Sequence, residues 1–182
     1  MTLGLVFLAN LSVADSTAPD PELKRALRDA IEDASSFEDR FHAEVWLSDM
    51  SSRLARQVPD TDERLHILKR VHLEASRAEL PPELVLAVIQ VESNFDRFAI
   101  SYAGARGLMQ VMPFWLDEIG RPNDNLFNIN TNLRMGCTIL RFYLNKEKGN
   151  LPKALARYNG SVGRRVYSDK VLNALSRKWF RQ

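Results

Sequence analysis

The sequence predicts a mainly α-helical fold, and three observations support this prediction. Apolar residues recur at helical spacing along most of the chain, and no run of alternating apolar and polar residues is long enough for a strand. Glycine and proline, with eight residues each, leave long stretches uninterrupted. The 45% hydrophobic and 26% charged content is typical of a globular protein. A chain of 182 residues can hold one domain with a real core and a small helical extension.

Residues 1–14 are predicted to be a signal peptide. The segment from Leu3 to Ala14 has the length of a signal-peptide apolar region, and Ser12-Val13-Ala14 is similar to a cleavage site. It is too short to span a bilayer. No basic residue precedes it, so the alternatives are a misassigned start or a frayed terminus. We expect the protein to be periplasmic or otherwise exported.

Residues 15–79 are predicted to form an N-terminal helical extension. Its first helix should begin at Asp20-Pro21-Glu22, where a cap residue, a proline and an acidic residue follow one another. Its third helix should begin at Asp60, because Asp60 and Glu63 have the spacing of a capping box. The second helix is expected to have an apolar face made of Phe37, Phe41, Val45, Trp46, Met50 and Leu54.

Glu92 ends a stretch that should be a buried helix. Residues 84–91 are nearly all apolar, and a helix that is apolar on every side belongs inside a protein. Both burial and the negative end of the helix dipole would raise the pKa of Glu92. A partly protonated carboxyl near neutral pH can act as a general acid. From the spacing alone, the alternative is a helix-end glutamate that is exposed to solvent.

The remaining elements are predicted to be short helices separated by polar turns. At most a short β-hairpin is expected between Phe98 and Met112, where Gly104 and Gly107 mark turns. The helices are expected at residues 113–119, 129–144, 151–158 and 164–179.

Charge and cysteine content exclude several classes of function. Residues 151–182 hold eight Lys or Arg residues against Asp169 alone, a net charge of +7, within a chain whose net charge is +2. This segment could bind nucleic acid, anionic lipid or an anionic cell-wall polymer, but a solvated helix face is the preferred interpretation, and we expect no nucleic-acid partner.

The single cysteine, Cys137, excludes an intramolecular disulfide and a cysteine-based metal cluster. The spacing of His66 and His72 is not that of a helical metal site, so neither a metal nor a cofactor is expected.

Several spaced motifs resemble one known family. They are Glu92-Ser93-x-Phe95, Ala99-x-Ser101, Gly104-Ala105-x-Gly107-Leu108-Met109-Gln110-x-Met112-Pro113 and Tyr158-Asn159-Gly160. Together they resemble the catalytic domain of the lytic transglycosylases of the soluble, goose-lysozyme-like type, over roughly residues 80–171. The resemblance implies a lysozyme-like helical domain at residues 80–182.

The resemblance also implies a site. Glu92 would be the sole catalytic acid and base, in a cleft that binds glycan, and the Tyr158 hydroxyl would lie within its reach. The residues that would contact substrate or hold Glu92 are Ser101, Gln110, Met112, Tyr158 and Asn159. Without the resemblance, Met112 and Tyr158 would be interpreted as packing residues. The sequence departs from the family pattern at Asp96-Arg97, Phe114-Trp115 and Arg157, which affects the preference for particular glycan units more than the chemistry.

The implied activity is cleavage of peptidoglycan glycan strands. The β-1,4 bond between N-acetylmuramic acid and N-acetylglucosamine would break without water, leaving 1,6-anhydromuramoyl ends. A hydrolase would need a second carboxylate, and none near Glu92 in sequence has an obvious partner role. The alternatives are a goose-type lysozyme-like hydrolase and a non-catalytic peptidoglycan-binding module. We expect a monomer whose N-terminal helices pack on the catalytic domain or contact cell-envelope proteins.

Overall fold

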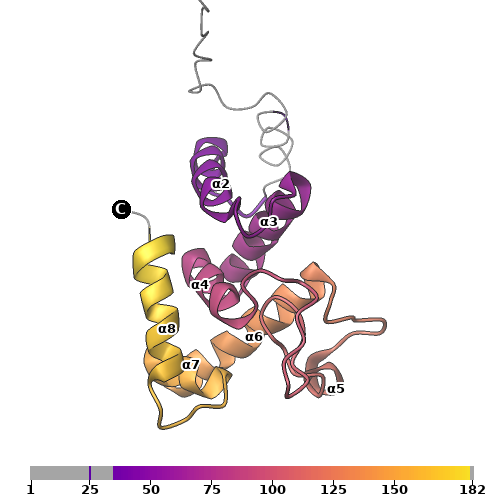
Figure 1. Cartoon of the computed structure of the whole chain (residues 1–182), viewed down its shortest axis with the longest axis vertical. Coiled ribbons are helices and arrows are strands. Elements are labelled where there is room, and N and C mark those ends of the chain that lie inside the picture. Colours follow the sequence, from indigo (N-terminus) through magenta and orange to yellow (C-terminus); the bar gives the residue numbers. More distant parts are fainter. Residues whose placement is uncertain (1–24, 26–34, 181–182) are drawn as a thin grey trace, which may run out of the picture.

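A computed structural model describes residue 25 and residues 35–180, and it confirms the mainly helical fold class (Figure 1). The helices of the described residues are α2 (Arg40–Leu54), α3 (Thr61–Arg77), α4 (Pro82–Glu92), α5 (Trp115–Ile119), α6 (Ile129–Lys146), α7 (Leu151–Tyr158), α8 (Val166–Ala174) and a final π-helical turn, η1 (Leu175–Trp179). The predicted signal peptide lies outside the described residues. So does the helix predicted from Asp20, apart from Arg25, which is helical.

The first two of these helices begin at aspartate caps. The Asp39 side chain accepts a 2.7 Å hydrogen bond from the His42 backbone N–H, and the Asp60 side chain accepts one of 2.7 Å from the Glu63 N–H. Such caps satisfy backbone donors that have no partner within the helix. The helix start predicted at Asp60 is therefore confirmed.

The apolar face predicted for α2 is only partly right. Trp46 and Leu54 are buried, but Phe41 is 75% exposed. Phe41 lies five residues before Trp46, which places it about 140° away around a helix of 3.6 residues per turn. Phe37 precedes the helix and stacks on His72, with ring centroids 3.5 Å apart.

Helix α4 lies at the centre of the molecule, between α3 on one side and α8 with η1 on the other (Figure 1). Leu84–Ile89 is fully buried, as its apolar sequence predicts. The indole N–H of Trp179 in η1 donates a 2.6 Å hydrogen bond to the Gln90 side chain. The helix that carries Glu92 is therefore held rigidly on both sides.

The segment from 93 to 114 contains no strand, and the expected hairpin reduces to two isolated antiparallel bridges. These bridges pair Ile100 with Arg106 and Arg106 with Val111. Gln110 adopts a left-handed conformation (φ 49°), and its side-chain N–H donates to the carbonyl oxygens of Ala99 and Gly107. The fold of this loop therefore depends on side chains that bond to backbone, not on a sheet.

Asn132 of α6 holds the same loop in place through hydrogen bonds to its backbone. It is 1% exposed, accepts a 2.8 Å hydrogen bond from the Met109 N–H, and donates 2.8 Å bonds to the carbonyl oxygens of Arg106 and Leu126. Gly107 passes over it at φ 76°, where a Cβ would lie 2.4 Å from the Asn132 side-chain nitrogen. Only glycine fits there, for both conformational and steric reasons.

The C-terminal helices follow the predicted order. The side chain of Asn128 caps α6 and that of Asn150 caps α7, and α7 packs against α6 and α8. Cys137 is buried in α6, and burial raises the pKa of its thiol, as expected for a packing residue and not a nucleophile.

One hydrophobic core joins all of these elements. Its buried residues run from Ala43 in α2 to Trp179 in η1, so α2 and α3 share the core of the helices that follow. Among the described residues, no helix combines the length and apolar character needed to cross a membrane.

Candidate active site

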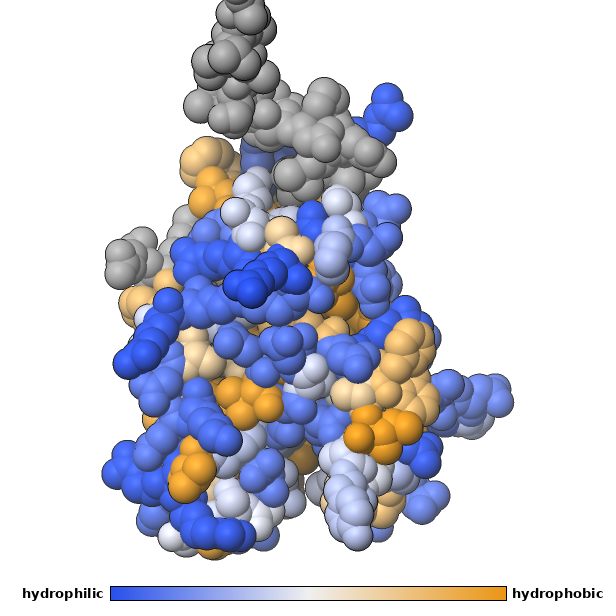
Figure 2. All heavy atoms as spheres, viewed as in Figure 1, coloured by the Kyte–Doolittle hydropathy of each residue, from blue (hydrophilic) through white to orange (hydrophobic). Residues whose placement is uncertain are grey.

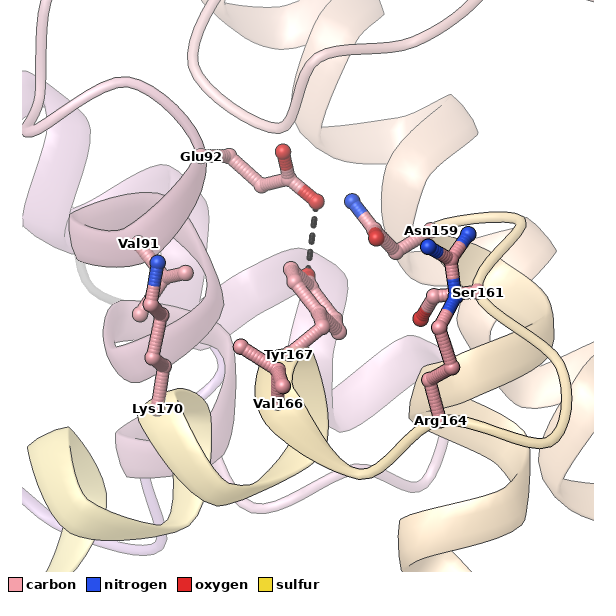
Figure 3. A pocket seen from close by; sticks show the side chains of 8 residues that line it. All are labelled: Val91, Glu92, Asn159, Ser161, Arg164, Val166, Tyr167 and Lys170. Carbon is pink, nitrogen blue, oxygen red and sulfur yellow. Dashed lines mark hydrogen bonds between the residues drawn. The ribbon is translucent and has the colours of Figure 1, made fainter.

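A cleft of about 440 Å³ opens beside Glu92 (Figure 3). Its walls come from the end of α4, the turn after α7 and the start of α8. The lining residues are Val91, Glu92, Asn159, Ser161, Arg164, Val166, Tyr167 and Lys170. Segments some 70 residues apart in sequence meet here because α4 packs against α8.

Glu92 is the last residue of α4, and a tight turn follows it. The Ser93 hydroxyl lies 3.2 Å from the Ile89 carbonyl oxygen and 2.8 Å from that of Leu108, which ties the helix end to the neighbouring loop. Asn94 and Phe95 adopt left-handed conformations, and Phe95 is buried against Trp179, with ring centroids 5.5 Å apart. This arrangement turns the chain away and leaves the Glu92 carboxyl directed into the cleft (Figure 3).

Two polar side chains contact the carboxyl group. The Tyr167 hydroxyl donates a 2.6 Å hydrogen bond to Glu92 Oε1, and the Asn159 side-chain amide faces the same carboxyl and lowers its pKa. Figure 3 shows both reaching toward Glu92 from the floor and the far wall of the cleft. Because these two residues come from different elements, they fix the position of the carboxyl from two directions.

The environment raises the pKa of Glu92 above its ordinary value. Burial is the main cause, and the hydrogen bonds from Tyr167 and Asn159 act in the opposite direction without reversing it. Burial, together with the neighbouring Glu92, raises the pKa of Tyr167 well above 10, so its hydroxyl stays protonated as a donor. A carboxyl with a raised pKa in an accessible cleft can deliver a proton near neutral pH.

The Tyr158 hydroxyl donates a 2.7 Å hydrogen bond to the Met109 carbonyl oxygen, and the hydrogen bond that reaches Glu92 comes from Tyr167. Burial and then the charge of Glu92 raise the pKa of Tyr158. Tyr167 was missed because it lies 75 residues after Glu92 and belongs to none of the quoted motifs. The one available signal was its helical spacing to Val171, which is also buried and indicates an inward face.

The other predicted site residues are divided between the cleft and the loop. Asn159 lines the cleft with Glu92, as expected. The Ser101 hydroxyl accepts a 3.0 Å hydrogen bond from the Ala105 N–H and closes a turn, while Gln110 holds the loop as described above. Met112 is partly buried, and none of Ser101, Gln110 and Met112 lines the cleft around Glu92.

Glu92 is the only carboxylate that lines the cleft among the described residues. Asp124 lies outside the cleft, where it forms an ion pair with Arg134 and accepts a hydrogen bond from Thr131. Within residues 35–180, no group of three or more metal-ligating side chains is placed to hold a metal ion. The other charged groups in the cleft are two cations, Arg164 and Lys170.

Two known proteins are similar in sequence to part of this chain. The membrane-bound lytic murein transglycosylase C of Yersinia pestis (strain Pestoides F) and that of Yersinia pseudotuberculosis (serotype O:1b, strain IP 31758) are each 31% identical to it over 140 residues. Each match covers 63% of this chain and 39% of the relative, so the chain spans about two fifths of their length.

Two solved structures and one family also match. The 70 kDa soluble lytic transglycosylase of Escherichia coli has a TM-score of 0.49 at 17% identity, covering 84% of this chain and 29% of its own. An inactive mutant of the lytic transglycosylase Slt of Pseudomonas aeruginosa has a TM-score of 0.49 at 21% identity, covering 86% and 34%. The family described as "Transglycosylase SLT domain" matches residues 71–175, which is more than half of the 182 residues. The chain therefore belongs to the transglycosylase SLT domain family.

Proposed function

We propose that this protein is a peptidoglycan lytic transglycosylase with Glu92 as its sole general acid and base. The observation that carries the proposal is the single carboxyl in the cleft, with a raised pKa and a hydrogen bond from Tyr167. The murein transglycosylase names of its relatives support peptidoglycan as the substrate. Their membrane-bound description, with the signal peptide predicted at residues 1–14, supports action in the cell envelope.

In the first proposed step, Glu92 protonates the oxygen of the glycosidic bond. The bond between that oxygen and C1 of the muramoyl ring breaks, and the N-acetylglucosamine unit leaves with the proton. Positive charge then develops at the muramoyl C1, next to a Glu92 that has become a carboxylate. The hydrogen bond from Tyr167 stabilises this carboxylate at the moment when it forms, and the neighbouring Asn159 amide acts in the same direction.

In the second step, the C6 hydroxyl of the same ring attacks C1. The new C6–O–C1 bond closes the 1,6-anhydro ring, and Glu92 accepts the hydroxyl proton, which restores its starting state. An intramolecular nucleophile has a large effective-concentration advantage over water. A hydrolase would instead use a second carboxylate about 5–9.5 Å from the first, and the cleft lining offers no such group.

The products distinguish the proposed activity from its alternatives. Digestion of purified peptidoglycan in ¹⁸O-water should give soluble fragments with 1,6-anhydromuramoyl ends and no label from solvent, because no water takes part. Mass spectrometry of the fragments measures this. Labelled reducing ends as the main product would reject the mechanism in favour of a hydrolase. Binding to the wall without any soluble fragments would favour a binding module.

Replacing Tyr167 with Phe should change the pH profile of cleavage. The hydroxyl stabilises the carboxylate form of Glu92, so its loss should raise the pKa of Glu92 further. The acid is active when protonated, so the alkaline limb of the profile should move to higher pH, by about one pH unit if a charge-assisted bond worth about 1.5 kcal/mol is lost. The rate at the optimum should fall, because the carboxyl is held less firmly.

Tyr158→Phe is the matched control for this experiment. It removes the same hydroxyl from a tyrosine that bonds the Met109 carbonyl oxygen, so it should cost about 1–2 kcal/mol of stability and leave the alkaline limb in place. A shift of the limb in Tyr158→Phe, or its absence in Tyr167→Phe, would contradict the role assigned to Tyr167.

A further inference from the structure

Two cations line the Glu92 cleft without a side-chain partner among the described residues. Arg164 and Lys170 are exposed, and neither side chain forms an ion pair or a hydrogen bond within that part of the chain. Other basic side chains nearby are paired: Arg165 lies 3.4 Å from Asp169, and Arg157 pairs with Glu147. What distinguishes Arg164 and Lys170 from the other basic side chains without an ion pair, such as Arg177, is that they line the cleft of Glu92.

These cations lie on either side of the start of α8 (Figure 3). The Arg164 side chain extends along the wall that carries Asn159 and Ser161, while the Lys170 side chain extends along the wall formed by Val91. Neither side chain is hydrogen-bonded to the carboxyl of Glu92, which accepts its hydrogen bond from Tyr167.

The start of α8, in the same wall, also favours an anionic ligand. Helix α8 begins without a side-chain cap, so the first backbone N–H groups of this nine-residue helix have no side-chain acceptor. Uncapped helix starts attract anions, through both these donors and the helix dipole.

The glycan backbone alone does not explain these cations, because the sugar rings and the bond to be cleaved are uncharged. Peptidoglycan carries negative charge beside this bond, in the carboxylates of the peptide attached to the muramoyl unit. Lysine and arginine are the residues that bind carboxylates in proteins, and arginine can do so through two hydrogen bonds. A carboxylate bound at the rim would also orient the muramoyl unit relative to Glu92.

We propose that Arg164 and Lys170, together with the start of α8, form a subsite for a carboxylate of the peptide carried by the muramoyl unit. The inference rests on the proposed function and extends it: the enzyme would select peptide-bearing strands over bare glycan.

Binding measurements in the full chain carrying Glu92→Gln test this proposal without cleavage of the probe. The probe is a soluble tetrasaccharide fragment with peptides that hold free carboxylates, and the second probe is the same fragment with those carboxylates converted to amides. Titration calorimetry gives both affinities for the Glu92→Gln chain. It is repeated after adding Arg164→Gln and Lys170→Gln together, or Arg177→Gln alone.

The Glu92→Gln chain should bind the carboxylate probe more tightly than the amide probe, and added salt should reduce this preference. Adding Arg164→Gln and Lys170→Gln should weaken binding of the carboxylate probe about tenfold, since exposed ion pairs contribute about two- to fivefold each. Affinity for the amide probe should change less than about twofold. Arg177→Gln removes the same charge from exposed η1, outside the cleft, and should affect neither probe.

Several results would overturn the subsite. They are equal weakening for both probes, an effect of Arg177→Gln as large as that of the double variant, or no preference for the carboxylate probe before the cations are removed. Failure to bind either probe would also overturn it. Lysis of peptidoglycan by the wild-type chain is measured separately. If lysis is absent, the proposed function fails, while the binding data still decide the subsite.

Discussion

Glu92→Gln is expected to lower the rate of peptidoglycan cleavage by at least about 100-fold, the lower end of the range for general acid catalysis. Glutamine keeps the shape of the side chain and can still accept the hydrogen bond from Tyr167, but it has no proton to deliver to the leaving oxygen. No second carboxylate lines the described cleft to replace it. Turbidity clearance of purified cell walls at equal protein concentration measures the loss.

The folded state should survive this substitution. Burial raises the pKa of Glu92, which means that the charged form is destabilised where it sits, and a neutral amide avoids that cost. The melting temperature should therefore be unchanged or higher. Glu118→Gln is the matched control, because Glu118 is an exposed carboxylate on α5 outside the cleft, and it should clear walls at the wild-type rate. Near-wild-type clearance by Glu92→Gln would remove Glu92 from its assigned role.

The sequence predicted most of the helical framework, because those helices are specified by local patterns. The apolar run before Glu92 predicted the buried helix that the structure shows. The cap at Asp60 is equally local, because it joins two residues three apart in sequence. The last helix was predicted to begin at Arg164, whereas α8 begins two residues later, at Val166. Boundaries shift in this way because caps and turns are decided by a few local hydrogen bonds.

Side-chain partners that depend on tertiary packing were not predicted. Two tyrosines nine residues apart could each have reached Glu92, and only the packing of α8 on α4 gives the hydrogen bond to Tyr167 and not to Tyr158. The resemblance implies that Ser101 and Gln110 contact substrate or hold Glu92, and the sequence does not show the hydrogen bonds that both form to backbone within the loop. A local sequence pattern does not show whether a polar side chain bonds its own loop or faces a cleft.

The loop from 93 to 114 is the part of the fold that the sequence specified least clearly. It has no regular structure to satisfy its backbone groups, so buried polar groups must find partners from elsewhere. Three side chains provide these partners at Leu108 and Met109. The Ser93 hydroxyl bonds the Leu108 carbonyl oxygen. Asn132 bonds the Met109 N–H, and Tyr158 bonds the Met109 carbonyl oxygen. Because Ser93 follows Glu92 directly, this network links the loop to the helix end that carries the acid.

Asn132→Ala is expected to destabilise the protein by about 2 kcal/mol or more, since it leaves two buried backbone groups without partners at about 1–3 kcal/mol each. These groups are the Met109 N–H and the Leu126 carbonyl oxygen, whereas the Arg106 carbonyl oxygen keeps its hydrogen bond from the Val111 N–H. A loss of this size is a large share of the total stability of a domain, about 5–15 kcal/mol, and urea unfolding followed by circular dichroism measures it.

Asn145→Ala makes the same change at an exposed position of α6 and should alter stability by less than about 0.5 kcal/mol. Because the loop is held against the end of α4, cleavage per folded molecule should fall in Asn132→Ala and stay unchanged in Asn145→Ala. A loss below about 1 kcal/mol would mean that water replaces the amide, and that this asparagine does not anchor the loop.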